Sequence, residues 1–368
     1  MKTLLKTFAF MLSLSISSVF ASPNLIPAPP QLSASSYILM DAYTGDVLVE
    51  HNSNMIVEPA SLTKLMTAYI VEYELARGNL TFEDMVTVSE KAWRMGGSRM
   101  FIREGTQVSI ENLLRGIIIQ SGNDASVAAA EYIAGSESAF ADLMNQHAKL
   151  LGMNNTNFVN ASGFPAENHY STAYDMALIS RATILQFPEN YKMYAEKEFT
   201  YNDIRQPNRN RLLWRDKTVD GLKTGHTEAA GYCLAVSAVR NGTRMIAVVM
   251  GTKSDEARAA EAQKLMDFGF RYYETRKLYS RGQVVNNARV WGGKQSSVKV
   301  GFDEDVLVTM PRQQGQTLPA TLEMQKELIA PIAVGDVLGT IVVGTEGNVV
   351  LERSVVALEA VEAGGFFK

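Results

Sequence analysis

The chain has 368 residues, of which 46% are hydrophobic, and its formal net charge is −4 at pH 7. This length is typical of about two domains, and the hydrophobic fraction is sufficient for a large folded core. The acidic balance leaves no basic surplus for holding nucleic acid, so the composition excludes a nucleic-acid-binding protein.

The N-terminal segment is typical of a secretory signal. Two lysines precede an apolar run, which ends in small residues before a cleavage site at Ser22. The run is short for a membrane span, which needs about 20 apolar residues. We expect residues 1–21 to be a signal peptide, with a retained anchor as the alternative; loss of its two lysines would change the formal charge from −4 to −6. Residues 22–36, rich in proline and serine, predict an extended lead-in.

Strand-like and helix-like patterns alternate between residues 37 and 276. Two apolar runs around residues 43–46 predict a hairpin, and two later runs, 232–239 and 245–250, predict another through Asn241-Gly242. This order predicts an α/β (α+β) domain over 37–276, with an antiparallel sheet faced by helices and an inserted helical lobe. Helices are expected over about 59–76, 110–119, 124–135, 138–152, 174–187 and 256–275.

After about Leu278 the residue pattern changes to short alternating runs separated by glycine or proline. This pattern predicts a separate all-β domain over residues 277–361, without histidine or a concentration of catalytic groups. Cys233 is the only cysteine, so no internal disulfide can form, and its apolar surroundings predict a buried core residue. One cysteine and four histidines also make a structural zinc site improbable.

The stretch PASLTKLMT places Ser61 and Lys64 three residues apart in a helical pattern. Residues at this spacing share a helix face, so the amine can reach the hydroxyl. A serine becomes a strong nucleophile when a base takes its proton, and a lysine can be that base where burial and nearby cations lower its pKa. A second match, Ser296 to Lys299, lies in a strand-like run whose side chains at this spacing point to opposite faces, so we reject it.

Two further short motifs carry polar groups suited to substrate binding. QSGNDAS places Ser121 and Asn123 between two helical stretches, where a hydroxyl can relay a proton and an amide can both donate and accept. An ordinary helix cap is the alternative for these residues. DGLKTGHTEAAGY places Lys223, Thr224 and Gly225 before His226 at a strand edge. The cation and hydroxyl can hold a carboxylate and the glycine permits close approach, with a solvated strand end as the alternative.

Together, Ser-x-x-Lys, Ser-x-Asn and Lys-Thr-Gly in this order are the signature of class A β-lactamases and penicillin-binding proteins. The chain resembles the low-molecular-mass penicillin-binding proteins, specifically D-alanyl-D-alanine carboxypeptidases of the penicillin-binding protein 5 type, from about residue 37 to 361. The longer stretches VDGLKTGHTEAAGY, PNRNRLLW, RGIIIQSGNDAS and YSTAYDMALIS are also similar to that family. The resemblance implies a serine β-lactamase/transpeptidase-like catalytic domain followed by a β-rich C-terminal domain.

The resemblance also implies a role for each motif residue. Ser61 would be the acylated nucleophile, Lys64 its general base, and Ser121 a proton relay. The remaining implied roles concern binding. Asn123 would hold the substrate amide, and Lys223 and Thr224, with Arg258, would bind the terminal carboxylate. Gly225 would let the peptide lie along the strand, and the backbone N–H groups of Ser61 and His226 would form the oxyanion hole.

The implied reaction is removal of the terminal D-alanine from peptidoglycan stem pentapeptides in the periplasm, with acylation by β-lactams and no metal or cofactor. The stretch KAWRMGGSRMFIREG is shorter than the corresponding active-site loop of that family, so we expect the deacylation rate to differ. Residues 362–368 resemble the remnant or start of a membrane-anchoring segment, through which relatives associate peripherally with the inner membrane. Seven residues are too few for a stable interfacial helix, so we expect weak membrane affinity for this chain.

Three rival functions remain open on the same fold. A β-lactamase would share the motifs, but the sequence has no clear E-x-x-L-N element for a deacylating water, and the β domain is unusual for that class. A D,D-endopeptidase that cuts cross-links differs only in the preferred peptide. A non-catalytic wall-binding protein is disfavoured because Ser61, Lys64, Ser121, Asn123 and Lys223 are all present.

Overall fold

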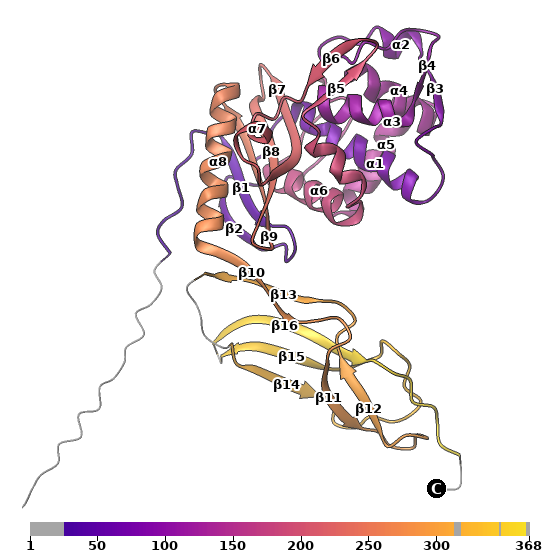
Figure 1. Cartoon of the computed structure of the whole chain (residues 1–368), viewed down its shortest axis with the longest axis vertical. Helices are drawn as coiled ribbons and strands as arrows, with labels where there is room; N and C mark the ends of the chain where they lie inside the picture. The colour runs from indigo at the N-terminus through magenta and orange to yellow at the C-terminus, as the bar shows by residue number, and fades with distance from the viewer. Residues whose placement is uncertain (1–25, 313–317, 346, 366–368) are drawn as a thin grey trace, which may run out of the picture.

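The computed structural model describes residues 26–312, 318–345 and 347–365, and Figure 1 shows an elongated molecule with two parts joined end to end. The predicted signal peptide, residues 1–21, lies outside the described residues, as do the last three residues of the predicted anchor segment. Residues 26–35, within the predicted lead-in, form no helix or strand, and the first strand begins at Ser36. In the described ranges, no helix combines the length and the apolar character needed to cross a bilayer.

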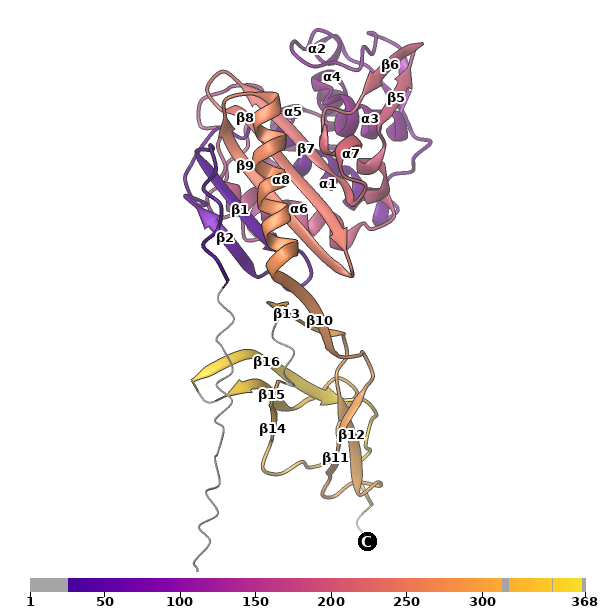
Figure 2. The same cartoon turned by 60° about the vertical axis from the view of Figure 1, so that its left-hand side comes forward.

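The upper part in Figure 1 is built on a five-stranded antiparallel sheet. Its strand order is β2-β1-β9-β8-β7, so β7 forms one edge. Helix α8 (Asp255–Tyr272) lies on one face and the helical lobe lies on the other (Figure 2). The strands are β1 (Ser36–Asp41), β2 (Val47–His51), β7 (Val219–Thr227), β8 (Gly231–Arg240) and β9 (Thr243–Thr252).

Both faces of this sheet are buried, which explains the nearly continuous apolar runs of its central strands. On β9, Ile246 and Val248 belong to the core shared with the helical lobe, whereas Ala247 and Val249 pack on the α8 side. Successive side chains of a strand point to opposite faces, so each face needs its own apolar set. The hairpin at Asn241-Gly242 is confirmed: φ is 52° and 81° at these residues, as a two-residue turn of this kind requires.

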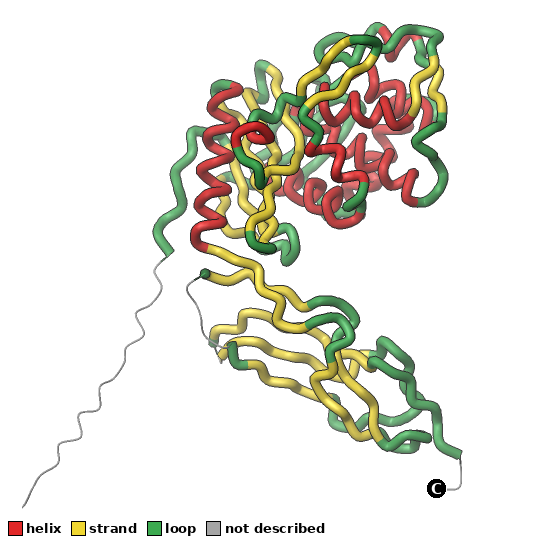
Figure 3. The backbone as a smooth tube through the Cα atoms, viewed as in Figure 1, coloured by secondary structure: helices red, strands yellow, loops and turns green. Residues whose placement is uncertain are grey.

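The helices of the lobe follow the expected stretches closely (Figure 3). The pattern over 110–119 forms α3 (Ile110–Arg115), continued by the π-helical turn η2 (Gly116–Gln120). Two short ribbons that the sequence patterns did not predict are β3 (Met85–Thr87) with β4 (Gln107–Ser109), and β5 (Glu198–Tyr201) with β6 (Ile204–Pro207). The remaining helical elements are η1 (Ala60–Thr63), α1 (Lys64–Ala76), α2 (Glu90–Trp93), α4 (Asn123–Ala134), α5 (Glu137–Leu150), α6 (Ala173–Gln186), η3 (Asn190–Ala195) and α7 (Leu212–Arg215).

The last helix of this part is shorter than expected. The helix predicted over 256–275 ends at Tyr272, and Tyr273–Tyr279 forms strand β10. In β10 the backbone pairs with β13 (Val306–Pro311), so strand pairing overrides the helical pattern of the last three expected residues. The prediction of the C-terminal end of this helix was therefore wrong by three residues.

The lower part in Figure 1 is all-β, as predicted. Besides the β10–β13 ribbon, it contains a second five-stranded antiparallel sheet with the order β11-β12-β16-β15-β14. Its own core gathers buried residues such as Val298, Val300, Ile341 and Val355. The strands are β11 (Val284–Arg289), β12 (Ser297–Gly301), β14 (Ala320–Met324), β15 (Val337–Thr345) and β16 (Asn348–Ala357).

The two parts are joined by hydrogen bonds to one buried aspartate of β1. The Oδ2 atom of Asp41 accepts from the hydroxyl of Thr275 on β10 at 2.6 Å and from that of Thr309 on β13 at 3.0 Å. Its Oδ1 atom accepts the backbone N–H of Tyr43 at 2.8 Å. The β10–β13 ribbon is thereby tied to the end of the first sheet that carries the β1–β2 turn.

Candidate active site

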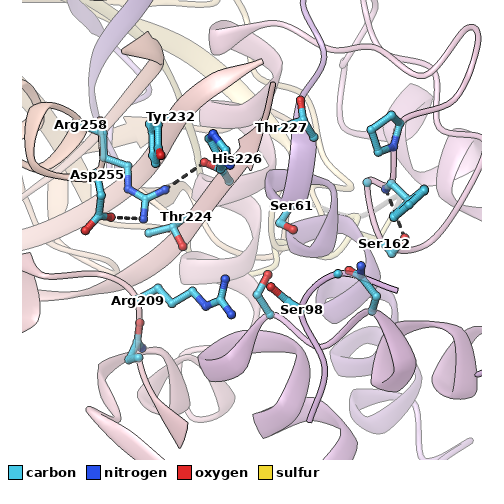
Figure 4. Close-up of a pocket in the computed structure, with 18 of the residues that line it drawn as sticks. Ser61, Ser98, Ser162, Arg209, Thr224, His226, Thr227, Tyr232, Asp255 and Arg258 are labelled. Carbon is cyan, nitrogen blue, oxygen red and sulfur yellow. Dashed lines mark hydrogen bonds and ion pairs between the residues drawn. The ribbon is translucent and has the colours of Figure 1, made fainter. Parts of the chain in front are cut away.

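A cavity of about 700 Å³ lies between the edge strand β7 and the helical lobe. Figure 4 shows Thr224 and His226 on one side, Ser61 near the centre, and Ser98 and Ser162 toward the lobe. The predicted residues that line it are Ser61, Ser121, Asn123, Thr224, Gly225, His226 and Arg258. Lys64 and Lys223 do not line the cavity itself, and both are buried in the surrounding protein. The structure thus brings all nine predicted residues into one region.

Ser61 lies on the 3₁₀ turn η1, directly before α1, which begins at Lys64. The sequence predicted that these two side chains share a helix face, and the Nζ atom of Lys64 donates to the Oγ atom of Ser61 at 3.0 Å. The tighter turn suits this contact because side chains three residues apart eclipse one another in a 3₁₀ helix. Gly163 packs directly against η1: a Cβ atom there would lie 1.8 Å from the carbonyl oxygen of Ala60.

Lys64 is fully buried, and its amine contacts three oxygen atoms. Besides Ser61, it donates to the Oδ1 atom of Asn123 at 2.7 Å and to the carbonyl of Ser162 at 2.5 Å. Burial, together with the nearby charge of Arg209, lowers the pKa of Lys64 to about 7, while Asp124 acts in the opposite direction. A lysine with this pKa is substantially neutral at physiological pH and can accept a proton from a hydroxyl.

The second motif runs from the end of η2 into the first residue of α4, whereas the sequence placed it between two helical stretches. Ser121 ends η2 with φ of 65°, and its buried Oγ atom makes no hydrogen bond to any part of the chain that the structure describes. Asn123 is the first residue of α4, and its Nδ2 atom donates to the carbonyl of Gly96 at 2.7 Å. The position of Ser121 is compatible with a proton relay, and that role stays a prediction.

The third motif lies on the edge strand β7, which supplies Lys223, Thr224, Gly225 and His226. Burial and the charges of Lys64 and Arg209 lower the pKa of Lys223 well below its usual range. The absence of a side chain at Gly225 lets β7 approach η1, because a Cβ atom there would lie 3.1 Å from the carbonyl oxygen of Pro59. The glycine therefore brings the strand close to the turn that carries Ser61, a packing role that the sequence did not predict.

Arg258 reaches the same strand from the start of α8. Its Nη1 atom donates to the carbonyl of Gly225 at 3.0 Å, its guanidinium pairs with Asp255, and it lies 5.6 Å from the ring of Tyr232 (Figure 4). These contacts fix the guanidinium beside Thr224, on the side of the cavity where a carboxylate was predicted to bind.

Arg209 is a site residue that the sequence analysis did not single out. Figure 4 shows its guanidinium directed into the cavity, and no hydrogen bond or ion pair joins its side chain to the described residues. The stretch PNRNRLLW, which contains it, was noted as family-like, but spacing alone gave no reason to select this arginine. Its charge lowers the pKa of both buried lysines, so it also shapes the acid–base chemistry.

Neither Cys233 nor the rejected pair Ser296 and Lys299 lines the cavity. Cys233 is fully buried in the core of β8, and burial raises the pKa of its thiol to about 11. The rejected pair Ser296 and Lys299 lies in the β domain, where Lys299 belongs to strand β12 and pairs with Glu359 on the surface. Within the described residues, no group of three or more histidine, cysteine, aspartate or glutamate side chains is arranged to hold a metal ion.

Both parts of the chain match known protein families. The profile of peptidase family S11, D-alanyl-D-alanine carboxypeptidase, matches residues 24–254, and that of the penicillin-binding protein 5 C-terminal domain matches residues 273–363. The chain is 44% identical over 358 residues to the D-alanyl-D-alanine carboxypeptidase DacC of Escherichia coli strain K12, covering 95% of this chain and 89% of that protein.

Solved structures agree with these matches. Penicillin-binding protein 5 of Haemophilus influenzae gives a TM-score of 0.86 at 42% identity, covering 91% of this chain and 99% of that chain. Penicillin-binding protein D2 of Listeria monocytogenes, in the ampicillin-bound form, gives a TM-score of 0.60 at 31% identity, covering 65% of this chain and 98% of that chain.

Fold and site together define a serine enzyme of the penicillin-binding class. The chain belongs to the D-alanyl-D-alanine carboxypeptidase family, peptidase family S11, and carries the C-terminal domain of penicillin-binding protein 5. The family and the fold class predicted from the sequence are both confirmed.

Proposed function

We propose that this chain removes the terminal D-alanine from peptidoglycan stem pentapeptides, with Ser61 as nucleophile and Lys64 as general base. One observation carries the proposal: the Lys64 amine lies 3.0 Å from the Ser61 hydroxyl, and burial with the Arg209 charge lowers its pKa to about 7. A serine flanked by such a base is equipped for acyl transfer. The names of its relatives support the choice of the D-Ala–D-Ala bond.

In the proposed acylation, the Oγ atom of Ser61 bonds to the carbonyl carbon of the penultimate D-alanine while its proton passes to Lys64. The resulting oxyanion faces the backbone N–H groups of Ser61 and His226. In other enzymes, removal of one such donor costs about 3 kcal/mol of transition-state stabilisation. The C–N bond then breaks, and the leaving D-alanine nitrogen takes a proton by way of Lys64 or Ser121. Attack by water on the ester releases the shortened peptide and restores the hydroxyl of Ser61.

The terminal carboxylate of the substrate would be held on the side of the cavity formed by β7 and α8. The hydroxyl of Thr224 and the guanidinium of Arg258 lie on that side, and Lys223 is buried on β7. Arg209 directs its guanidinium into the same cavity from the segment between β6 and α7. These cations complement a carboxylate, and an arginine can bind one through two parallel hydrogen bonds. The Nδ2 atom of Asn123 donates one hydrogen to Gly96, so its second hydrogen is available for a substrate carbonyl.

A β-lactam would acylate Ser61 in the same way, because it presents a reactive amide and a carboxylate to the same groups. We place the reaction in the periplasm on the basis of the predicted signal peptide. Intact mass after incubation with penicillin, followed by peptide mapping, tests the proposal: an adduct on Ser61 is expected. An adduct elsewhere, or none, would overturn it, and rapid steady-state turnover of a chromogenic cephalosporin would favour the β-lactamase rival.

A further inference from the structure

Asp124, which follows Asn123 in α4, is 1% exposed and was assigned no role by the sequence motifs. Its Oδ1 atom accepts the backbone N–H groups of Met100 and Ala125, both at 2.9 Å. Its Oδ2 atom accepts those of Phe101 at 2.9 Å and Ile102 at 3.3 Å. Three of these four donors belong to one short loop, 96–102, that borders the cavity, so the carboxylate ties that loop to the start of α4.

The tied loop in turn holds Asn123. The carbonyl of Ser98 accepts the backbone N–H of Asn123 at 2.7 Å, and the carbonyl of Gly96 accepts its Nδ2 atom at 2.7 Å. Gly97 lies directly on this amide, because a Cβ atom there would be 2.8 Å from the Nδ2 atom. With Nδ2 fixed in this way, the opposite end of the amide, Oδ1, is directed at the amine of Lys64.

The loop has a conformation that needs external support. Phe101, which is not glycine, has φ of 69°, in the left-handed region that side chains rarely adopt. Such a conformation persists where the surroundings over-determine it. The Nε2 atom of Gln206 donates to the carbonyl of Met100 at 3.0 Å, and the Nε2 atom of Gln120 donates to the carbonyl of Arg99 at 3.1 Å. Asp124 accepts the N–H groups of Met100, Phe101 and Ile102 in the same loop.

We propose that Asp124 is a positioning residue that fixes loop 96–102 on Asn123 and thereby sets the rate at which Ser61 is acylated. The inference rests on the proposed roles of Ser61, Lys64 and Asn123. The Asp124→Asn change places an NH₂ group where one carboxylate oxygen accepts backbone N–H groups, so at least one donor of the loop loses its acceptor. Loop 96–102 would then detach, and Asn123 would lose both carbonyl acceptors.

The test compares wild type, Asp124→Asn and Asp41→Asn. Asp41 is a matched control because it is also buried and accepts backbone N–H groups, but at the junction with the β domain. The rate constant for acylation by a fluorescent penicillin is measured apart from the non-covalent affinity, together with limited trypsin cleavage at Arg99 and Arg103, which are exposed and flank the tied residues.

We expect Asp124→Asn to slow acylation at least about tenfold, since small misplacements of catalytic groups cost up to about a hundredfold. The non-covalent affinity should fall less than the acylation rate constant, because the groups proposed to bind the carboxylate lie outside this loop. Trypsin should cut Asp124→Asn faster at Arg99 and Arg103. Asp41→Asn should match wild type in both acylation rate and trypsin cleavage. Gln206→Ala, which removes another support of the same loop, should likewise slow acylation and speed trypsin cleavage. It replaces Asp124→Asn if that variant fails to fold.

Wild-type acylation rates in these loop variants would overturn the inference while leaving the proposed function intact. So would unchanged trypsin cleavage in Asp124→Asn. A wild-type protein that is not acylated at Ser61 would overturn the proposed function, and the inference with it.

Discussion

The amine of Lys64 lies 3.0 Å from the hydroxyl of Ser61, at the junction between the 3₁₀ turn η1 and helix α1. Burial of this amine, with Arg209 nearby, holds its pKa at about 7. A base and a nucleophile are thus placed in contact by three residues of local sequence, and tertiary burial supplies the proton affinity that the base needs.

Replacement of the base is expected to slow acylation. Lys64→Ala should lower the rate of adduct formation with penicillin by at least about 100-fold, the lower range of general-base contributions. Lys299→Ala is the matched control, because this lysine has the same spacing from a serine but lies exposed on β12. If Lys64→Ala were acylated as fast as this control, Lys64 would not be the base.

Acylation should depend on pH through Lys64. Below pH 7 the amine is mostly protonated and cannot accept the proton of Ser61, and above pH 7 it is mostly neutral, since its pKa is lowered to about 7. The rate constant should therefore rise with pH and level off above about pH 8. Stopped-flow acylation between pH 5 and 9 checks this, and a flat profile would argue against a titrating lysine base.

Removal of Arg209 should move that profile. The charge of Arg209 lowers the pKa of Lys64, so Arg209→Ala should raise this pKa and shift the rising limb of acylation to higher pH. Binding of a substrate carboxylate should weaken as well. Arg205→Ala is the control, because Arg205 is exposed and pairs with Glu198 on the β5–β6 ribbon. An unshifted limb in Arg209→Ala would mean that Arg209 does not act on Lys64.

Gly163→Ala should destabilise the protein. The new Cβ atom would lie 1.8 Å from the carbonyl oxygen of Ala60, and φ of 75° at this residue already disfavours a side chain. Overpacking of this kind costs about 1–3 kcal/mol, so we expect a loss of unfolding free energy in that range. Denaturant unfolding measures it, and Gly78→Ala, which has a positive φ but meets no atom within 4 Å, separates the clash from the backbone effect. Equal stability losses in both variants would contradict the clash.

Cys233 should be unreactive in the native protein. Its side chain is fully buried, and burial raises the pKa of the thiol to about 11. A thiol-specific reagent at pH 8 should label it only after denaturation, because the thiolate is the reacting form. Rapid labelling of the folded protein would show that β8 is more accessible than the structure indicates.

The sequence predicted most of the site because its key pairs are local. Ser61 and Lys64 are three residues apart, Ser121 and Asn123 flank one turn, and Lys223 begins a run along a single strand. Periodicity and spacing determine how such residues face one another, and the family resemblance supplied their order and implied roles.

The remaining features depend on contacts between distant segments. Arg209 and Asp124 act on Lys64 from elements far from it in the chain, and no local pattern distinguishes them from other charged residues. The predicted end of α8 was wrong for a related reason. Thr275 pairs with β13, which lies more than thirty residues later in the chain, and therefore forms part of a strand. Tertiary pairing of this kind outweighs helix propensity.

The most direct test of the account is D-alanine release from a peptide ending in D-Ala–D-Ala, with wild type beside Ser61→Ala. We predict release by wild type and none above background by Ser61→Ala. Release by both proteins, or by neither, would contradict a carboxypeptidase reaction that proceeds through Ser61.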